Sequence, residues 1–505
     1  MKLGITLVVT LSAGLLAGDD LSELRDALRS EKDKARRGAV ADLAELGGED
    51  AWELVLERGL TDLSPQVADE AQLRLGEAEI GGPLLGLVDS KLALRSRSEL
   101  VRLRVVEALG RAPGAVAPSL LERAIEDKDA EVRASAAYAA ELRFERGAEA
   151  LGLTSAEAAT DGDLADLVDA LRRAATRDKD HRARANSIAA LGRASALMGA
   201  GEESADLLAG AGERAPDLAR VALLAARPTI AALTRALERE EAAYSITAAK
   251  LLEAEGTRDA VLALAGRLAS NEPLRPALQH RIVRSLRRAS GLSHGASGER
   301  WLRWARDLPD DWRIGDDAQG RDGAGDEGGS TTFFGLRIVS DRVAFLVDMS
   351  GSMWSERDGE PRKDSVDVEL EAALRGLPET ARFDLVPYTN EPSPWKGELV
   401  PASKKTVDRA IKSFRGSGLR GKGNLWDALV PVLRDPEVDT VVILTDGAPT
   451  GGTRWNVDLM RTLLQDENRF RGVTIHVLLF DASKGLQKRW RKITEDHDGV
   501  LRVID

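Results

Sequence analysis

Apolar and polar residues recur at helical spacing through the first 300 residues of the chain. Val101, Val105, Ala108 and Leu109 stand at i, i+4, i+7 and i+8, so they form one apolar stripe along a helix. A similar phrase, again with an arginine in second place, returns 31 residues later at Val132. Further copies begin near Ala35, Val67 and Ala183, with fainter ones near Tyr244 and Ala277. The pattern predicts helices that recur along the chain.

Short turns bearing Gly, Asp or Pro, and a second apolar stretch, separate these phrases. A helix pair that returns every 31–34 residues cannot bury its own apolar stripe, so neighbouring pairs must stack on one another. The phrases resemble HEAT-type helical repeats. We therefore expect an α-solenoid over residues 19–307, without catalytic groups, that presents a curved surface. The alternative is an alanine-rich helical bundle that is not a repeat array.

The pattern changes to alternating strands and helices after residue 332. Strands are predicted at 333–338, 342–347, 382–388, 440–445, 473–480 and 500–504, and helices at 366–377, 405–414, 424–434, 456–470 and 486–495. This order is typical of a doubly wound, Rossmann-like α/β domain, with a mainly parallel sheet covered by helices on both faces. In such domains ligands bind beyond the carboxyl ends of the strands. The chain is therefore predicted to be multidomain.

Residues 308–332 separate the two patterns. Between positions 308 and 330 there are seven acidic and two basic side chains, with six glycines between Gly315 and Gly329. Too few apolar residues are present to order such a segment, so we expect an acidic, flexible linker. Its Gly323, Gly325 and Gly328 match the spacing of a dinucleotide-binding loop, but no strand is predicted before them and no helix after them.

The N-terminus has the features of a secretory signal peptide over residues 1–18. Lys2 is followed by an uncharged, mostly apolar run at 3–17 and by the small residue Gly18. The run is shorter than the about 20 residues that a membrane span needs. We therefore expect an exported protein, periplasmic or extracellular, with no membrane span after the signal is removed. An uncleaved apolar anchor or a buried first helix is the alternative.

Composition excludes several classes of function. The 505 residues carry 71 basic and 83 acidic side chains, a net charge of −12, which gives no general attraction to nucleic acid or anionic lipid. The chain has no cysteine, which excludes disulfides, thiolate zinc sites, iron–sulfur clusters and cysteine nucleophiles. Only four aromatic residues lie within the first 300 residues and sixteen within the last 205, which supports two different architectures.

Polar residues follow two of the predicted strands directly. Asp348, Ser350 and Ser352 come after strand 342–347, and Asp446 comes after strand 440–445. Because the carboxyl ends of parallel strands meet at one edge of a sheet, we expect both carboxylates and both hydroxyls at that edge. Hard oxygen ligands of this kind suit magnesium, which keeps several waters and takes few protein ligands.

The Asp-x-Ser-x-Ser loop and the later aspartate resemble a von Willebrand factor type A (VWA) domain over residues 333–505. A lead-in at 332–343 resembles that of bacterial exported members. The resemblance implies a metal-ion-dependent adhesion site (MIDAS), in which Ser350 and Ser352 ligate Mg²⁺, Mn²⁺ or Ca²⁺ directly and Asp348 and Asp446 do so directly or through water. It further implies metal-assisted binding of a protein partner, whose acidic residue completes the metal shell, without enzymatic turnover.

The second loop of the resembled site departs from the family pattern. Gly423 stands where the family carries a ligating threonine, and Asn424 follows it. Water, or the side chain of Asn424 if it turns inward, would replace the hydroxyl, so we expect weaker metal binding than in an intact site. The alternative is a metal-free scaffold with a degenerate MIDAS that keeps only the shape of the loops.

A P-loop is the least favoured interpretation of the same segment. Residues 416–423 differ from that motif at one position, and Lys422 would reach phosphates. The motif needs Ser or Thr at position 423 and a strand before Gly416, whereas the sequence has glycine and an amphipathic segment at 407–414. A nucleotide-binding enzyme therefore ranks behind both binding-protein hypotheses.

Overall fold

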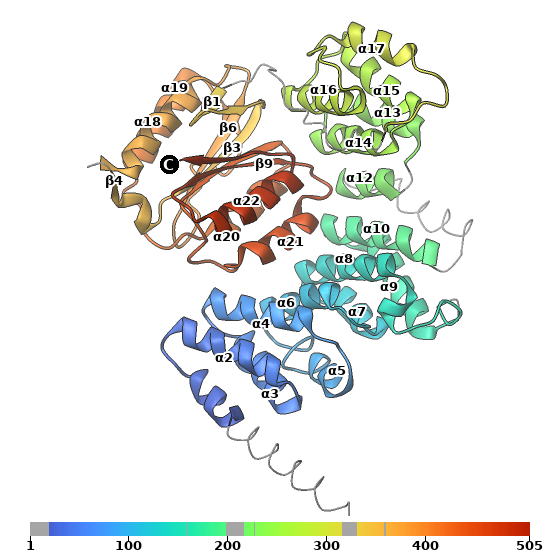
Figure 1. Ribbon diagram of the computed structural model, residues 1–505, viewed down its shortest axis with the longest axis vertical. Helices are drawn as coiled ribbons and strands as arrows, with labels where there is room; N and C mark the ends of the chain where they lie inside the picture. The colour runs from blue at the N-terminus through green and yellow to red at the C-terminus, as the bar shows by residue number, and fades with distance from the viewer. Residues whose placement is uncertain are drawn as a thin grey trace, which may run out of the picture. The chain divides into compact units, whose positions relative to one another are not determined.

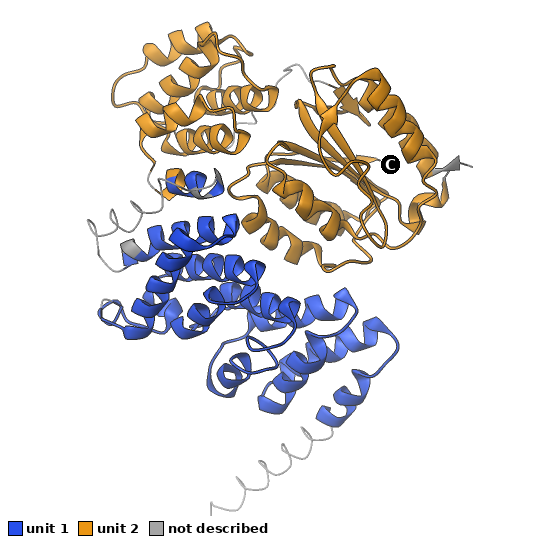
Figure 2. Cartoon of the chain, turned by 180° about the vertical axis from the view of Figure 1, so that it is seen from behind, with its two compact units in different colours: residues 1–223 blue, residues 224–505 orange. Residues whose placement is uncertain are grey.

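The computed structural model describes residues 20–158, 160–197, 217–226, 228–315, 331–357 and 360–504. The predicted signal peptide lies outside these residues. Contacts divide the chain into two compact units, residues 1–223 and 224–505 (Figure 2). Within the described residues, none of the helices combines the length and the apolar character that crossing a bilayer requires.

All regular elements in the described part of the first unit are helical. They are α2 (Asp33–Leu46), α3 (Glu49–Leu54), η1 (Val55–Gly59), α4 (Pro65–Glu77), α5 (Gly82–Val88), α6 (Glu99–Arg111), α7 (Pro118–Ile125), α8 (Ala130–Arg146), η2 (Ala148–Leu151), α9 (Gly162–Arg177), α10 (His181–Leu197) and the first part of α12 (Asp217–Ala226). Helix α2 packs on α4, α4 on α6, α6 on α8, and α8 on α10, while α3 packs on α5 and α7 on α9 (Figure 1). Each of these helices therefore packs on the helix whose label is two higher.

The arginine in second place of the recurring phrase makes the same contact in three copies. Each one forms an ion pair with an aspartate further along the chain: Arg36 with Asp62 at 2.7 Å, Arg102 with Asp127 at 2.7 Å, and Arg133 with Asp178 at 2.6 Å. Each also donates from Nη1 to the carbonyl oxygen six residues before it. These three copies of the phrase thus share the same contacts.

The second unit begins with the end of α12 and the helices α13 (Ile230–Leu237), α14 (Ala242–Glu255), α15 (Arg258–Ala269), α16 (Pro276–Ser290) and α17 (Gly298–Arg306). The first residues of the predicted linker, 308–315, pack back on these helices. The rings of Trp304 and Trp312 lie edge to face with centroids 5.8 Å apart, and the N–H of Ile314 donates to the carbonyl of Gly256 at 2.9 Å. The ring contact and this hydrogen bond order a stretch that its charge alone predicted to be flexible. Residues 316–330 lie outside the described residues.

The rest of the second unit is built on a six-stranded mixed sheet. Its strands are β3 (Arg342–Asp348), β6 (Arg382–Tyr388), β7 (Val400–Pro401), β8 (Thr440–Thr445), β9 (Thr474–Phe480) and β10 (Leu501–Ile504), in the order β10-β9-β8-β3-β6-β7. All neighbours are parallel except β7, which runs antiparallel to β6. The sequence did not reveal β7, because two residues are too short to show a period.

Helices cover both faces of this sheet (Figure 1). Helices α18 (Arg362–Arg375) and α19 (Lys404–Arg415) pack on one face, and α20 (Leu425–Arg434), α21 (Val457–Asn468) and α22 (Lys484–Asp496) pack on the other. In β3, Phe345 belongs to the first core and Leu346 to the second, so successive residues are buried on opposite sides. Burial of both faces explains why the central strands are almost continuously apolar.

The predicted single strand at 333–338 is wrong. The structure has a hairpin of β1 (Thr331–Phe333) and β2 (Leu336–Ile338), joined by Phe334 and Gly335. Both turn residues have positive φ, 48° and 71°, as a two-residue hairpin turn of the primed type requires. A phenylalanine at such a position conceals the turn, because glycine or asparagine is the usual signal.

A cluster of partly buried charges joins the helices of the second unit to its sheet. Asp498, in the turn between α22 and β10, forms ion pairs with Lys250 of α14, at 2.8 Å, and with Arg281 and Arg284 of α16. Burial raises the pKa of the Asp498 carboxyl, but the attraction of Arg281 and Lys250 outweighs this, so its pKa lies well below its usual value. The grouping of these helices with the sheet was not apparent from the sequence.

Candidate metal centre at the carboxyl edge of the sheet

Two aspartates stand at the carboxyl ends of neighbouring parallel strands. Asp348 is the last residue of β3, and Asp446 directly follows β8, which ends at Thr445. The two strands pair in parallel with Val347 opposite Leu444. The structure therefore brings both carboxylates to one edge of the sheet, although 97 residues separate them in the sequence.

The carboxylate of Asp348 is buried, with an exposed fraction of 4%. Its Oδ1 accepts the backbone N–H of Ser350 at 2.8 Å, and its Oδ2 accepts the hydroxyl of Thr445 at 3.0 Å. Burial raises its pKa to about 6 and the charge of Asp446 adds to the rise, whereas these hydrogen bonds oppose it. No cationic side chain among the described residues pairs with Asp348. A buried carboxylate without a cation partner is a fitting ligand for a metal ion.

Both predicted serines lie beside this carboxylate. The hydroxyl oxygens of Ser350 and Ser352 are 3.1 Å apart. Ser350 is buried, and Ser352 is exposed. The N–H of Gly351, between them, donates to the carbonyl of Gly421 at 3.0 Å, which ties the first loop to the second. The first loop thus groups one carboxylate and two hydroxyls within a few residues.

Gly423 lies directly against Asp348. A Cβ atom placed on Gly423 would meet Asp348 Oδ2 at 3.3 Å, so a side chain at this position would reach the carboxylate after a small shift. The backbone of Gly423 is fixed by Thr450, whose hydroxyl accepts its N–H at 2.8 Å and whose N–H donates to its carbonyl at 3.0 Å. Gly423 in place of the threonine therefore leaves a space next to the Asp348 carboxylate. The hydrogen bonds to Thr450 hold the backbone of the loop in place.

Asn424 does not turn toward the carboxylates. Its side-chain oxygen accepts the N–H of Asp427 at 3.3 Å, which caps the N-terminus of α20. Its amide donates to the carbonyl of Asn390 at 2.9 Å and to the carboxylate of Asp427 at 2.8 Å. Asparagine is among the preferred N-cap residues, and here that role uses both ends of the side chain. The idea that Asn424 replaces the threonine is therefore corrected.

Two residues at this edge were missed by sequence reasoning. Thr445 could have been found, because it ends a strand immediately before Asp446 and carries a hydroxyl. Arg362 gave no signal, because it lies 84 residues before its partner Asp446. It stands in the first turn of α18, and its Nη1 is 3.3 Å from Asp446 Oδ2 while its Nη2 is 2.6 Å from Asp481 Oδ2. One of the two predicted carboxylates is thus already paired with a cation.

Exposed cations border the first loop. Arg420 and Lys422 of the second loop are exposed, and the Arg420 guanidinium lies 4.2 Å from the centre of the Trp354 ring. The indole N–H of Trp354 donates to the carbonyl of Leu419 at 3.0 Å, which holds the ring against the second loop. The rim beside Ser350 and Ser352 is therefore positively charged.

The donor set at this edge fits magnesium or manganese in part. Asp348, Ser350 and Ser352 offer hard oxygens in one loop, as Mg²⁺ prefers. Within the described ranges, histidine, aspartate and glutamate side chains do not gather in threes as a metal site, so any metal here would keep water ligands. Gly423 offers no side-chain oxygen, and Arg362 competes for Asp446.

The P-loop alternative lacks its structural context. Residues 416–423 follow helix α19, which ends at Arg415, and not a strand. A P-loop needs a strand directly before its first glycine, so that its backbone amides can surround phosphate. Lys422 is instead an exposed residue of the second loop.

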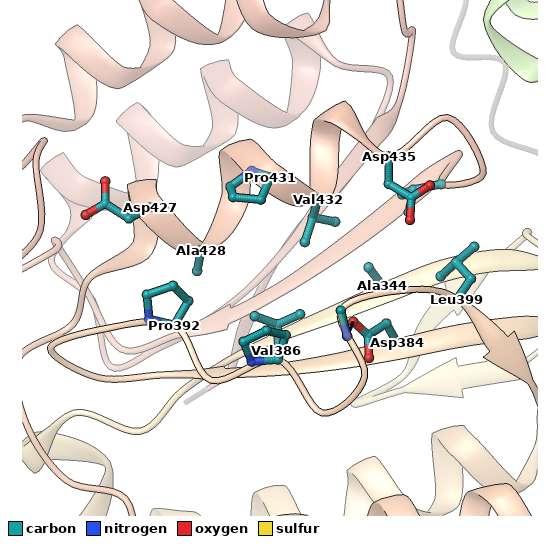
Figure 3. A pocket seen from close by; sticks show the side chains of 13 residues that line it. Ala344, Asp384, Val386, Pro392, Leu399, Asp427, Ala428, Pro431, Val432 and Asp435 are labelled. Carbon is teal, nitrogen blue, oxygen red and sulfur yellow. Dashed lines mark hydrogen bonds between the residues drawn. The ribbon is translucent and has the colours of Figure 1, made fainter.

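A cavity of about 220 Å³ lies apart from this edge. Figure 3 shows Ala428 and Val432 of α20 facing Ala344 of β3 and Val386 of β6 across it. Its lining is mostly apolar and includes none of the predicted metal ligands. Asp427 borders the cavity and also holds Asn424.

Comparisons with known proteins agree on the C-terminal part of the chain. Residues 341–496 match the family model described as von Willebrand factor type A domain. Inter-alpha-trypsin inhibitor heavy chain H4 is 30% identical over 191 residues in the human protein and 25% identical over 190 residues in the Bos taurus protein. Both matches cover 34% of this chain and 20% of the relative. Human von Willebrand factor A domain-containing protein 3B is 24% identical over 164 residues, covering 32% of this chain and 12% of that protein.

The matches thus span about a fifth of the length of the inhibitor heavy chains. Among solved structures, human deoxyhypusine hydroxylase aligns with 58% of this chain and 97% of its own at 19% identity, with a TM-score of 0.23.

Proposed function

We propose, from the premise that residues 341–496 form a von Willebrand factor type A domain, that this chain binds a protein partner at the carboxyl edge of its sheet through a divalent metal ion. The observation that carries the proposal is the carboxylate of Asp348. It is buried beside two serine hydroxyls, and no cation among the described residues neutralises it. A charge buried in this way needs a partner, and a metal ion would supply one.

Ser350 and Ser352 would ligate the ion directly, and Asp348 and Asp446 would do so directly or through water. Mg²⁺ is the first candidate, with Mn²⁺ or Ca²⁺ as substitutes, because all three take oxygen ligands. Water would stand where Gly423 lacks a hydroxyl, so binding would be weaker than in a complete site. The two carboxylates neutralise the ion, and an open coordination position would still accept one more anionic ligand.

The partner would present an acidic side chain at that open position. The exposed Arg420 and Lys422 support this, because they give the rim of the site the opposite charge. The similarity to inhibitor heavy chains also favours a binding role over catalytic turnover, and we propose no enzymatic activity.

The helical part would act as the scaffold. We propose that its helix pairs continue as a HEAT-like α-solenoid, supported by the repeated Arg–Asp ion pairs and by the succession of packed helices in the first unit. We also propose an extracytoplasmic location, on the basis of the apolar run at residues 3–17, and a bacterial host, on the basis of the lead-in at residues 332–343.

A metal-free scaffold is the second candidate function. Two observations favour it: Gly423 supplies no ligand, and Arg362 already pairs with Asp446. In that case the loops would bind a partner by shape and charge alone.

Calorimetric titration of the full chain with MnCl₂ or MgCl₂ tests the proposal. The wild type should bind one ion per chain, Asp348→Ala should abolish the binding heat, and Asp408→Ala on the exposed face of α19 should leave it unchanged. Absence of binding at millimolar metal would favour the metal-free scaffold. Protection by ATP that requires Lys422 would overturn both.

A further inference from the structure

Arg362 joins three elements at the edge of the sheet. Its guanidinium pairs with Asp446, after β8, and with Asp481, after β9. Its Nη1 also lies 3.4 Å from the carbonyl oxygen of Ser352, in the first loop. The side chain has an exposed fraction of 19%, so most of the guanidinium is shielded from water. Asp446 is shielded further, at 13%, which strengthens the attraction between them.

This position brings a fixed positive charge to a carboxylate that the metal site also needs. A divalent ion held by Asp446, directly or through water, would lie beside the guanidinium and be repelled by it. Asp348 pairs with no such cation among the residues that the structure describes. The two carboxylates are therefore unequal, since one is available to a metal ion and the other is already neutralised.

We propose that Arg362 is a built-in competitor of the divalent ion, whose guanidinium must release Asp446 before that residue can contribute to metal binding. Asp481 gives the guanidinium a second anchor, at 2.6 Å, on which it can remain after Asp446 is released. The site would then exist in two forms, an arginine-paired form and a metal-bound form. The inference rests on the proposed metal site and adds a residue that sets its affinity.

A purely structural role for Arg362 makes the opposite prediction. If the guanidinium only holds the first loop and the third loop, which begins at Asp446 after β8, in place, its removal would loosen Ser352 and Asp446 and weaken metal binding. The direction of the change in affinity therefore separates competition from support.

The test is a titration of the full chain with MnCl₂, followed by calorimetry and by the electron paramagnetic resonance signal of free Mn²⁺. Arg362→Gln removes the charge and keeps a similar length, and Arg362→Lys keeps the charge. Arg375→Gln is the matched control, because Arg375 lies on the same helix and pairs only with residues away from the site. Asp446→Asn with and without Arg362→Gln completes a double-mutant cycle.

We expect Arg362→Gln to tighten Mn²⁺ binding about five- to tenfold, as a moderate coupling between two sites would. Arg362→Lys and Arg375→Gln should stay near wild type, and Arg362→Gln should have no more than a small effect once Asp446 is asparagine. Binding that is unchanged or weaker in Arg362→Gln overturns the inference, while the metal proposal survives if Asp348→Ala still abolishes binding. If no variant binds Mn²⁺, both proposals fail. If only Arg362→Gln binds it, the competition is confirmed.

Discussion

The hydroxyl of Thr445 donates to Asp348 Oδ2 at 3.0 Å, from one parallel strand to the end of its neighbour. This contact helps to fix the carboxylate that the whole site depends on, because Asp348 is buried and its other oxygen accepts the backbone N–H of Ser350. It also means that the first and third loops are coupled before any ligand binds.

Replacing Thr445 with valine tests that coupling. Valine keeps the shape and removes the donor, so the buried carboxylate loses one of its hydrogen bonds. We expect the free energy of unfolding to fall by about 1 to 2 kcal/mol. Urea denaturation followed by tryptophan fluorescence measures it. Thr462→Val, whose hydroxyl bonds its own helix backbone, should change stability far less; equal losses would contradict a special role for Thr445.

Gly423→Thr should restore part of the missing ligand set. The backbone at Gly423 is not in the left-handed region, and a Cβ there lies 3.3 Å from Asp348 Oδ2, so a threonine fits with a small shift. We expect Mn²⁺ to bind about tenfold more tightly, because a charge-neutral oxygen replaces a water at a preformed position. Calorimetry of the full chain checks it. Gly485→Thr, at a position with open space, is the control. Affinity that stays the same or falls would argue against a metal at this loop.

The strands of the sheet, and the residues at their ends, could largely be predicted from the sequence. The predicted strands 382–388 and 440–445 agree with β6 and β8. The almost continuous apolar run of β8 is typical of a strand buried on both faces, and β6 shows the same run interrupted by Asp384. Their parallel order then places Asp348 and Asp446 at one edge. The partners of individual side chains were harder to predict. An asparagine such as Asn424 can serve as a metal ligand or as a helix N-cap, and in the structure the path of the loop places it as the N-cap.

Arg362 could not have been found in the sequence. It lies far from Asp446 along the chain, and its charge is one of 71 basic side chains. Helix α18 begins at Arg362, four residues before the predicted start at 366. The position of that first turn relative to β8 and β9 is a property of the tertiary fold, which a hydrophobic pattern does not encode.

Stability should depend on pH through Asp498. Its pKa is depressed from the ordinary value of 3.8, so its ion pairs stabilise the fold fully above that pH and are lost as the pH falls toward its folded pKa. Asp498→Asn should cost about 3 to 5 kcal/mol at pH 7, because Lys250 and Arg281 lose their common, partly buried partner. Asparagine tolerates the positive φ of 58° at this position, so backbone strain does not confuse the result.

Urea denaturation at pH 7 and pH 3 measures this effect. The difference in free energy of unfolding between wild type and Asp498→Asn should shrink at pH 3. Asp496→Asn, which removes a more exposed pair with Arg461, should cost no more than about 1 kcal/mol at either pH. A difference at Asp498 that is the same at both pH values would contradict the assignment.

Substitution of the repeated arginine should lower the stability of the first unit where the arginine side chain is buried. Arg102 has an exposed fraction of 4% and pairs with Asp127, so Arg102→Met leaves the partly buried carboxylate of Asp127 without its cation. We expect the first unit to lose about 3 to 5 kcal/mol, measured by chemical denaturation with circular dichroism. Arg29→Met, which breaks an exposed pair with Asp26, should be close to neutral. Similar effects of both substitutions would show that the repeated ion pair is not what stabilises the helix stack.

The most direct test of the central claim is anomalous diffraction from crystals of the full chain soaked in MnCl₂. The account predicts a manganese peak beside the hydroxyl oxygens of Ser350 and Ser352 and the carboxylate of Asp348, with the guanidinium of Arg362 moved from Asp446 toward Asp481. A map without a peak at this edge, in which Arg362 still pairs with Asp446, would contradict it.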